Sequence, residues 1–226
     1  MKYAVIGLGE FGRNAAIGLA RRGAEVIAVD IRMDPVNCVK DEVTLAVKMD
    51  GSQEGAMATH GIGEVDILIA AIGENFEAQV LTVVHASQSG IKKVIARAKT
   101  PDHIRVLKAV GADEAFNPEE TAARWMVQLL LIANVSNYFE LAEGFSVVEV
   151  EAPSGIVGKT LEELDLRKKF RINLVAVLRM VESRGSGKLI SKFDPVPDPK
   201  QVIEENDVLT IAGSVLDLAN FMGQFE

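Results

Sequence analysis

The first half of the chain alternates short apolar runs with longer amphipathic stretches. The run Ile67-Leu68-Ile69-Ala70-Ala71 is apolar at every position, which is typical of a parallel strand covered on both faces. Strands are expected over 3–6, 25–29, 43–47, 66–71, 93–96 and 114–116, and helices over 11–22, 35–41, 52–60, 76–89 and 101–110. Strand followed by helix, repeated, predicts an α/β fold with a Rossmann-like, doubly wound parallel sheet.

A longer helix is expected to begin at Asn117, which can cap it, with Pro118 in the first turn. Glu119 and Glu120 then face the positive end of the helix dipole. From 122 to 135 the residues are almost all apolar, so this helix needs cover on nearly every side. Two interpretations remain open at this point: a subunit interface, or burial within one domain.

A second, smaller pattern begins near residue 145 and predicts a small α+β domain. Its expected strands are 146–151, 174–179, 189–191 and 208–212, and its expected helices are 160–171 and 214–222. We place the boundary within 141–144, which gives a first domain over 1–140 and a second over 145–226. Segment 194–199 contains three prolines and is expected to be an extended connector.

Composition narrows the class of protein. The chain has 24 Lys+Arg against 32 Asp+Glu, a formal net charge of −8, and no long basic tract, which argues against a nucleic-acid partner. The longest stretch without Asp, Glu, Lys or Arg is 125–139, shorter than the ~20 apolar residues that span a membrane. No export signal is visible, so we expect a cytoplasmic protein. The single Cys38 is expected to be a small buried thiol.

The segment Gly7-Leu8-Gly9-Glu10-Phe11-Gly12 is a GxGxxG motif between the first expected strand and the first expected helix. Gly7 permits a tight turn, and Gly9 lets a diphosphate approach the backbone at the amino terminus of the helix. Gly12 permits close packing of the helix on the strand. The motif in this context predicts a nucleotide site.

Asp30 ends the second expected strand, eighteen residues after Gly12, where a carboxylate accepts hydrogen bonds from ribose hydroxyls. Its charge disfavours a 2′-phosphate, although the neighbouring Arg32 weakens that inference. Asp50 follows the third strand, where ligand binding and capping of the expected helix are both open. The remaining candidates at this edge of the sheet are Ile31, Gly51, Ser52, Ala71, Ile72 and Gly73.

The sequence shows no catalytic or metal-binding constellation. His60, His85 and His103 are scattered and there is only one cysteine, so no metal site is expected. A hydride-transfer enzyme needs a proton donor beside the nicotinamide, and no histidine follows residue 145. We expect a protein that is not an enzyme, with a small NAD-dependent oxidoreductase as the main alternative from another class.

Several segments together resemble the TrkA/KtrA family of RCK proteins, the regulators of potassium conductance. The resemblance covers essentially all 226 residues, as an RCK N-terminal nucleotide-binding domain followed by a TrkA-C domain. Its segments are 5–12, 29–30, 71–75, 111–113, 117–119 and 157–161. It implies a cytosolic regulatory subunit, peripheral to the inner face of the cell membrane, beneath a membrane-embedded K⁺-translocating subunit of TrkH/KtrB type. It also implies a homodimer that assembles into a ring, with the crossover and dimer region at 122–135.

The resemblance implies an adenine-nucleotide ligand: NAD(H), ADP, ATP or AMP. The matched cradle comprises Gly7, Gly9, Phe11, Gly12, Asp30, Ala71, Ile72 and Gly73. Arg97 matches a basic residue that approaches phosphates, and Glu119 matches an acid near a cation at the dimer contact. Glu10 departs from the family pattern, because KtrA-like members often carry arginine there, reaching the terminal phosphate of ATP across the dimer. A carboxylate repels that phosphate, which shifts the expectation toward NAD(H), ADP or AMP.

A second effector is a further expectation from the resemblance. Arg167 and Asn173 match the spacing of residues that contact cyclic di-AMP in some relatives. The alternative is a solvated cationic face over 167–171. The expected mechanism is a ligand-driven shift between states of the ring. A stand-alone nucleotide sensor with another partner would use the same residues.

Overall fold

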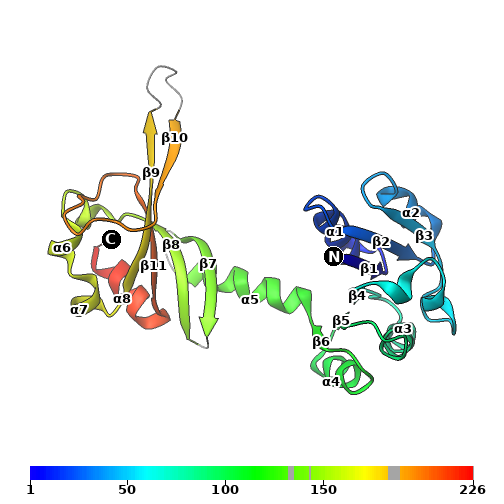
Figure 1. Ribbon diagram of the computed structural model, residues 1–226. Helices are drawn as coiled ribbons and strands as arrows, with labels where there is room; N and C mark the ends of the chain where they lie inside the picture. Colours follow the sequence, from blue (N-terminus) through cyan, green and yellow to red (C-terminus); the bar gives the residue numbers. More distant parts are fainter. Residues whose placement is uncertain (132–134, 143, 183–188, 226) are drawn as a thin grey trace. The chain divides into compact units, whose positions relative to one another are not determined.

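The computed structural model describes residues 1–131, 135–142, 144–182 and 189–225. The chain divides into two compact units, Met1–Ala122 and Ala123–Glu226, and each has its own β-sheet (Figure 1). The division falls within helix α5, Pro118–Leu131. Strand β7 ends at Ala142 and strand β8 begins at Phe145, and both belong to the sheet of the second unit.

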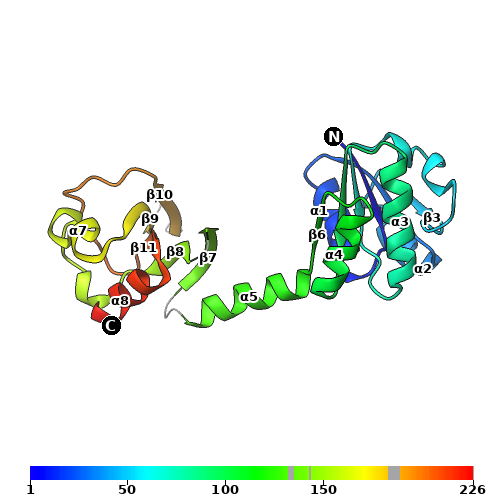
Figure 2. The same cartoon turned by 90° about the horizontal axis from the view of Figure 1, so that it is seen from below.

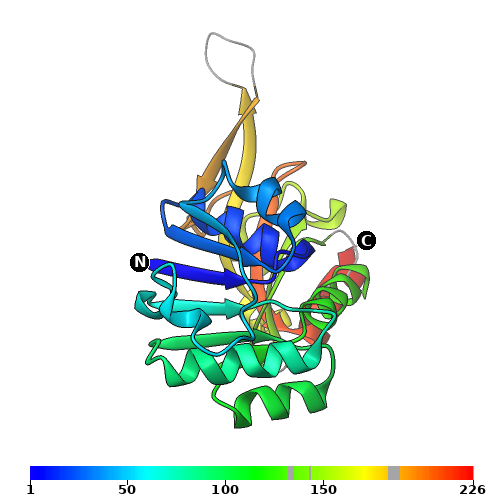
Figure 3. The same cartoon turned by 90° about the vertical axis from the view of Figure 1, so that its right-hand side faces the viewer.

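The first unit confirms the predicted doubly wound parallel sheet (Figure 3). The strand order is β3-β2-β1-β4-β5-β6, so the order reverses between β1 and β4. The strands are β1 Lys2–Ile6, β2 Glu25–Asp30, β3 Leu45–Lys48, β4 Ile67–Ala70, β5 Lys93–Arg97 and β6 Glu114–Phe116. Ligands of such folds bind outside the carboxyl ends of the strands at this reversal point.

Helices cover both faces of the first sheet because its strands are apolar on both sides. Side chains such as Val5 and Val26 pack toward α1 and α2, while Ile6 and Leu68 belong to the core beneath α3 and α4. The helices are α1 Glu10–Ala20, α2 Met33–Val39, α3 Phe76–Gln88 and α4 Pro101–Ala109. Their ends lie within two residues of the predicted ones.

The prediction of a helix over 52–60 is wrong. That part of the chain contains two short 3₁₀ turns, Ala56–Ala58 and Ile62–Glu64. Gly55 (φ +79°), His60 (φ +55°) and Gly61 (φ +73°) adopt left-handed backbone conformations. Each such residue interrupts the dihedral angles that an α-helix requires, so the apolar spacing cannot continue as a helix.

The second unit confirms the predicted small α+β fold. Its antiparallel sheet has the order β10-β9-β11-β8-β7, and helix α8 packs against β11 (Figure 2). The strands are β7 Val135–Ala142, β8 Phe145–Glu151, β9 Asn173–Glu182, β10 Leu189–Asp194 and β11 Val208–Ser214. The helices are α6 Leu161–Leu164, α7 Leu166–Phe170 and α8 Val215–Phe225, with a 3₁₀ turn at Ser154–Ile156.

The long apolar helix is shorter than predicted. Strand β7 begins at Val135, which was expected to be helical, and residues 132–134 lie outside the described ranges. Strand β7 pairs with β8 as the edge strand of the sheet, and Tyr138 accepts a 2.8 Å hydrogen bond from the Ser146 hydroxyl. In α5, Trp125 and Leu130 are 44% and 77% exposed, so burial within one domain is not what covers this helix.

Two smaller expectations also differ from the structure. The helix predicted over 160–171 is broken at Asp165 (φ +43°), which places both Leu164 and Leu166 in the core. Residues two apart point to opposite sides of a continuous helix, so burying both requires the break. Cys38 is exposed rather than buried, because it lies out of phase with the buried Val36 and Val39 of α2.

A buried ion pair ties the strands of the second unit together. Asp207 is 0% exposed and accepts hydrogen bonds from Arg179 Nε at 2.7 Å and Nη2 at 2.6 Å. Its Oδ2 also accepts from the Glu204 backbone N–H at 2.8 Å. The hydrogen bonds to Asp207 raise the pKa of the Arg179 guanidinium further above its already high value. The Arg179 guanidinium therefore stays protonated, as arginine side chains do in proteins.

We expect Asp207→Asn to lower the free energy of unfolding by about 3 kcal/mol, because it leaves the Arg179 guanidinium without its buried counter-charge. The matched control is Glu204→Gln, which removes the other, exposed carboxylate on Arg179 and should cost less than about 1 kcal/mol. Urea unfolding of both variants measures the difference. Equal losses in the two variants would contradict the assignment.

Candidate functional site

The glycine motif forms a tight turn packed against the end of β4. Gly7 has φ +95°, and a Cβ there would lie 2.9 Å from the backbone of Ala71 and Ile72. A Cβ on Gly12 would lie 1.8 Å from the Gly7 carbonyl oxygen. A Cβ on Gly9 would meet nothing within 4 Å, so the backbone at the start of α1 faces open space. This arrangement leaves room for a ligand group at the amino terminus of α1.

Two of the three variable positions of the motif, Glu10 and Phe11, point in different directions. The Glu10 carboxylate is exposed and accepts hydrogen bonds from Arg13 Nη2 at 2.7 and 2.9 Å. Phe11 packs edge-on against Phe116, with ring centroids 5.6 Å apart. Phe11 therefore supports the fold beneath the loop, while Glu10 holds a paired negative charge at its rim.

Asp30 ends β2 beside the glycine loop, and it braces that loop. Its Oδ2 accepts a 2.8 Å hydrogen bond from the Leu8 backbone N–H, and its Oδ1 accepts one of 2.9 Å from the Arg32 N–H. The side chain is nearly buried, whereas Ile31 is 60% exposed next to it. Arg32 Nε lies 3.7 Å from Asp30 Oδ1. Asp30 thus joins the end of β2 to the loop between β1 and α1.

Asp50 closes a local turn after β3. Its Oδ1 accepts hydrogen bonds from the Ser52 backbone N–H at 3.0 Å and hydroxyl at 2.7 Å, and these bonds lower the pKa of the carboxyl. Since the predicted helix at 52–60 is absent, the helix-capping interpretation of Asp50 is wrong. Gly51 is buried against Ile6, where a Cβ would lie 2.7 Å from that side chain. The Met49 N–H donates to the Asp30 carbonyl at 2.9 Å, which brings this turn beside β2.

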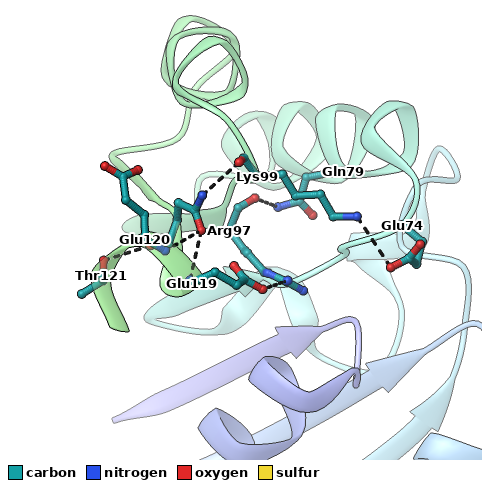
Figure 4. Close-up of polar contacts among 8 residues, drawn as sticks. Glu74, Gln79, Arg97, Lys99, Glu119, Glu120 and Thr121 are labelled. Atoms are coloured by element: carbon teal, nitrogen blue, oxygen red, sulfur yellow. Dashed lines mark hydrogen bonds and ion pairs between the residues drawn. The ribbon is translucent and has the colours of Figure 1, made fainter. Parts of the chain in front are cut away.

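Gln79 of α3 is a structural residue of the site that the sequence interpretation missed. Its Oε1 accepts from the Ile72 N–H at 3.0 Å, and its Nε2 donates to the Ala70 carbonyl at 2.7 Å. Nε2 also donates to the Arg97 carbonyl at 2.9 Å (Figure 4). The side chain is 1% exposed. One amide therefore satisfies the backbone ends of both β4 and β5. The available signal was a polar residue on the side of α3 that also carries the buried Val83 and Ala86.

Arg97 and Glu119 form an ion pair at the end of β5, although 22 residues separate them (Figure 4). The Arg97 side chain is only 16% exposed, and its Nε has no hydrogen-bond partner among the described residues. A Cβ on Gly73 would lie 2.5 Å from Arg97 Nη1. A small pocket of about 80 Å³ lies beside this guanidinium and includes the stacked rings of Phe76 and His103.

The residues expected to bind a second effector lie in the second unit. Arg167 on α7 and Asn173 at the start of β9 are both exposed. An open cleft of about 540 Å³ in the same unit is lined by other residues, including Lys159, Lys169 and Phe225. Lys159 Nζ lies 5.2 Å from the centre of the Phe225 ring. The sequence interpretation missed this cleft.

Among the residues of the described ranges, His, Cys, Asp and Glu side chains form no group of three or more that is placed to hold a metal ion. The helices in the same ranges are too short or too polar for any of them to cross a bilayer.

The fold and the glycine-motif edge define a Rossmann-type nucleotide-binding unit joined to a small α+β unit. The TrkA-N domain model matches residues 3–118, and the TrkA-C domain model matches residues 145–225. The chain belongs to the TrkA/Ktr family of potassium uptake proteins.

Similar proteins come from bacteria. Ktr system potassium uptake protein C of Bacillus subtilis (strain 168) is 36% identical over 97% of this chain and 95% of its own length. Ktr system potassium uptake protein A of the same strain is 32% identical with the same coverage. Among solved structures, the GsuK channel bound to NAD aligns with a TM-score of 0.53 and 22% identity, over 99% of this chain and 38% of that chain. That last similarity shows the fold alone.

The contrast between Gly12 and Gly9 predicts stability losses of different size. Gly12→Ala should cost about 3 kcal/mol, because its methyl group overlaps the Gly7 carbonyl and the turn must move. Gly9→Ala should cost less than about 1 kcal/mol, since its methyl enters open space and only the helix cap changes. Thermal unfolding of both variants measures this order, and the reverse order would show that the loop packs differently.

Proposed function

We propose that this protein is the regulatory subunit of a potassium uptake system. It binds an adenine nucleotide at the glycine-motif edge and controls a membrane-embedded K⁺-translocating partner from the cytoplasmic side. The observation that carries the proposal is the open backbone at Gly9, placed between the buried Asp30 and the phosphate-binding end of α1. The relatives that share almost the whole chain are named as potassium uptake proteins.

Each part of the edge suits one part of an adenine nucleotide. Backbone N–H groups at the start of α1 attract phosphate oxygens, and the helix dipole adds positive potential. Asp30 retains acceptor capacity for ribose hydroxyls beyond the two backbone hydrogen bonds it already accepts. Arg97 supplies a guanidinium beside Gly73 at the ends of β4 and β5.

Control of the partner requires assembly of this chain. The exposed apolar side chains of α5, including Trp125, Met126 and Leu130, support a homodimer that covers this helix. In the ring that such dimers build, ligands that prefer different states shift their populations and so change K⁺ flux. Arg167 and Asn173 are proposed as contacts for cyclic di-AMP in the second unit.

The proposal is tested with Gly9→Ala, which should fold normally and weaken nucleotide binding about ten-fold or more. A methyl group at this position separates the backbone donors from the phosphate oxygens, and 1.4 kcal/mol corresponds to a factor of ten. Calorimetry with NAD, NADH, ADP, ATP and AMP measures affinity, and mass spectrometry identifies any ligand retained on purification. Gly18→Ala, within the same helix, is the matched glycine control.

The same two variants test the coupling to transport. In vesicles that contain a K⁺-translocating subunit of the TrkH/KtrB class, nucleotide should change K⁺ flux when the wild-type chain or Gly18→Ala is present. Gly9→Ala should abolish that response. If K⁺ flux is the same with and without this chain while nucleotide binding is intact, the result would favour a stand-alone nucleotide sensor.

Glu10 predicts a preference among nucleotides. Its carboxylate lies at the rim of the loop and should repel the additional charge of a terminal phosphate. Glu10→Arg should therefore tighten ATP relative to ADP. The measurement is the ratio of the two dissociation constants by calorimetry. An unchanged ratio would contradict a role for this position in choosing between them, and Arg13→Gln controls for loss of the Glu10–Arg13 pair.

A further inference from the structure

The backbone of Arg97 is held in place, and its guanidinium can interact with groups on two sides. Gln79 holds the Arg97 carbonyl at 2.9 Å, so the end of β5 cannot easily shift. One side of the guanidinium faces Gly73 and the pocket of about 80 Å³ at the ends of β4 and β5. The other side, through Nη2, pairs with Glu119 (Figure 4).

The Arg97 guanidinium is mostly shielded from solvent, yet few of its N–H groups have hydrogen-bond partners in the described part of the chain. The side chain is 16% exposed, and Nε lacks a hydrogen-bond partner among the described residues. Arginine presents five N–H donors, and a single carboxylate oxygen on Nη2 leaves much of that capacity unused. An anion with several acceptor oxygens would satisfy Arg97 better than Glu119 does.

Glu119 is the partner that can leave. Its side chain is 62% exposed, so the carboxylate can return to water at little cost. Its backbone stays in the first turn of α5, where Asn117 Oδ1 accepts from the N–H groups of Glu119 at 3.0 Å and Glu120 at 3.2 Å. Asn117 Nδ2 also donates to the Lys99 carbonyl at 2.9 Å. The start of α5 is therefore tied to the end of β5 both by Asn117 and by the Arg97–Glu119 pair.

We propose that Glu119 is a specificity-determining residue of the nucleotide site, acting as an internal competitor for Arg97. A phosphate group bound at the ends of β4 and β5 takes the guanidinium and displaces the Glu119 carboxylate. The affinity for charged ligands is thereby lowered by the cost of breaking the pair, and the first turn of α5 loses one of its two ties when the ligand binds. This inference rests on the proposed nucleotide site. It adds that Glu119 makes the affinity of that site depend on the charge of the ligand.

The first test compares ADP with adenosine, which lacks phosphate, on wild type and Glu119→Gln. Glu119→Gln keeps the shape of the side chain and removes its charge, so ADP should bind about two- to five-fold tighter, the range expected for an exposed ion pair. Adenosine affinity should not change. Asp102→Asn is the matched control, because it removes a carboxylate that pairs with Arg105 in the first turn of α4.

The second test follows the first turn of α5 by hydrogen exchange. ADP should increase amide exchange over residues 119–122 in wild type, since binding releases Glu119 from Arg97. In Glu119→Gln that region should already exchange faster, and ADP should add no further increase. Light scattering during both titrations separates this effect from a change in oligomeric state.

The outcomes separate failure of the Glu119 competition from failure of the nucleotide site. If ADP binds wild type but its affinity is the same in Glu119→Gln, or if adenosine tightens equally, Glu119 does not compete for Arg97. A wild-type chain that binds neither ADP nor any other nucleotide tested overturns the nucleotide site and this inference together. Tightening of ADP in Asp102→Asn by the same factor would assign the effect to net charge and overturn the role of Glu119.

Discussion

The close contact between the β1–α1 turn and the end of β4 is the constraint on which the site depends. Gly7 lies against the backbone of Ala71 and Ile72, and Gly12 lies against the Gly7 carbonyl, with no space for a Cβ at either position. Because the turn is held this tightly, the Leu8 N–H reaches Asp30 and the first residues of α1 face outward at Gly9. A binding surface made of backbone N–H groups requires such support, since the backbone has no side-chain flexibility to correct a displaced loop.

Much of this edge could be predicted because its determinants are local. The spacing of Gly7, Gly9 and Gly12 between a strand and a helix specifies one kind of turn, and Asp30 follows from the next strand. Gln79 and the Arg97–Glu119 pair could not be found in this way, because their partners come from strands and helices that only the tertiary structure brings together. The chain from 122 onward shows a related limit, because a continuous apolar run is compatible with either a buried helix or a strand. From Val135 the run forms strand β7, which pairs with β8.

The second unit depends on polar anchoring as well as on its apolar core. Arg179 of β9 bridges Asp207, beside the start of β11, and the Val202 carbonyl at 2.9 Å, so one guanidinium holds the long connection 195–207 against the sheet. The break at Asp165 performs a similar task for the helices, because it places Leu164 and Leu166 in the same core. Neither feature follows from hydrophobic periodicity, which describes regular segments and not the contacts that fix irregular ones.

The net charge of −8 is compatible with an anionic ligand only because binding is governed by local groups. The start of α1 offers backbone donors, and Arg97 is the cation nearest to Gly73, yet Arg97 is already paired with a carboxylate. In the proposed competition, the electrostatic contribution of Arg97 to binding is the difference between its interactions with phosphate and with Glu119, not its full attraction for phosphate. The same proposal implies moderate affinity, and it links ligand occupancy to the start of α5, the helix that leads into the second unit.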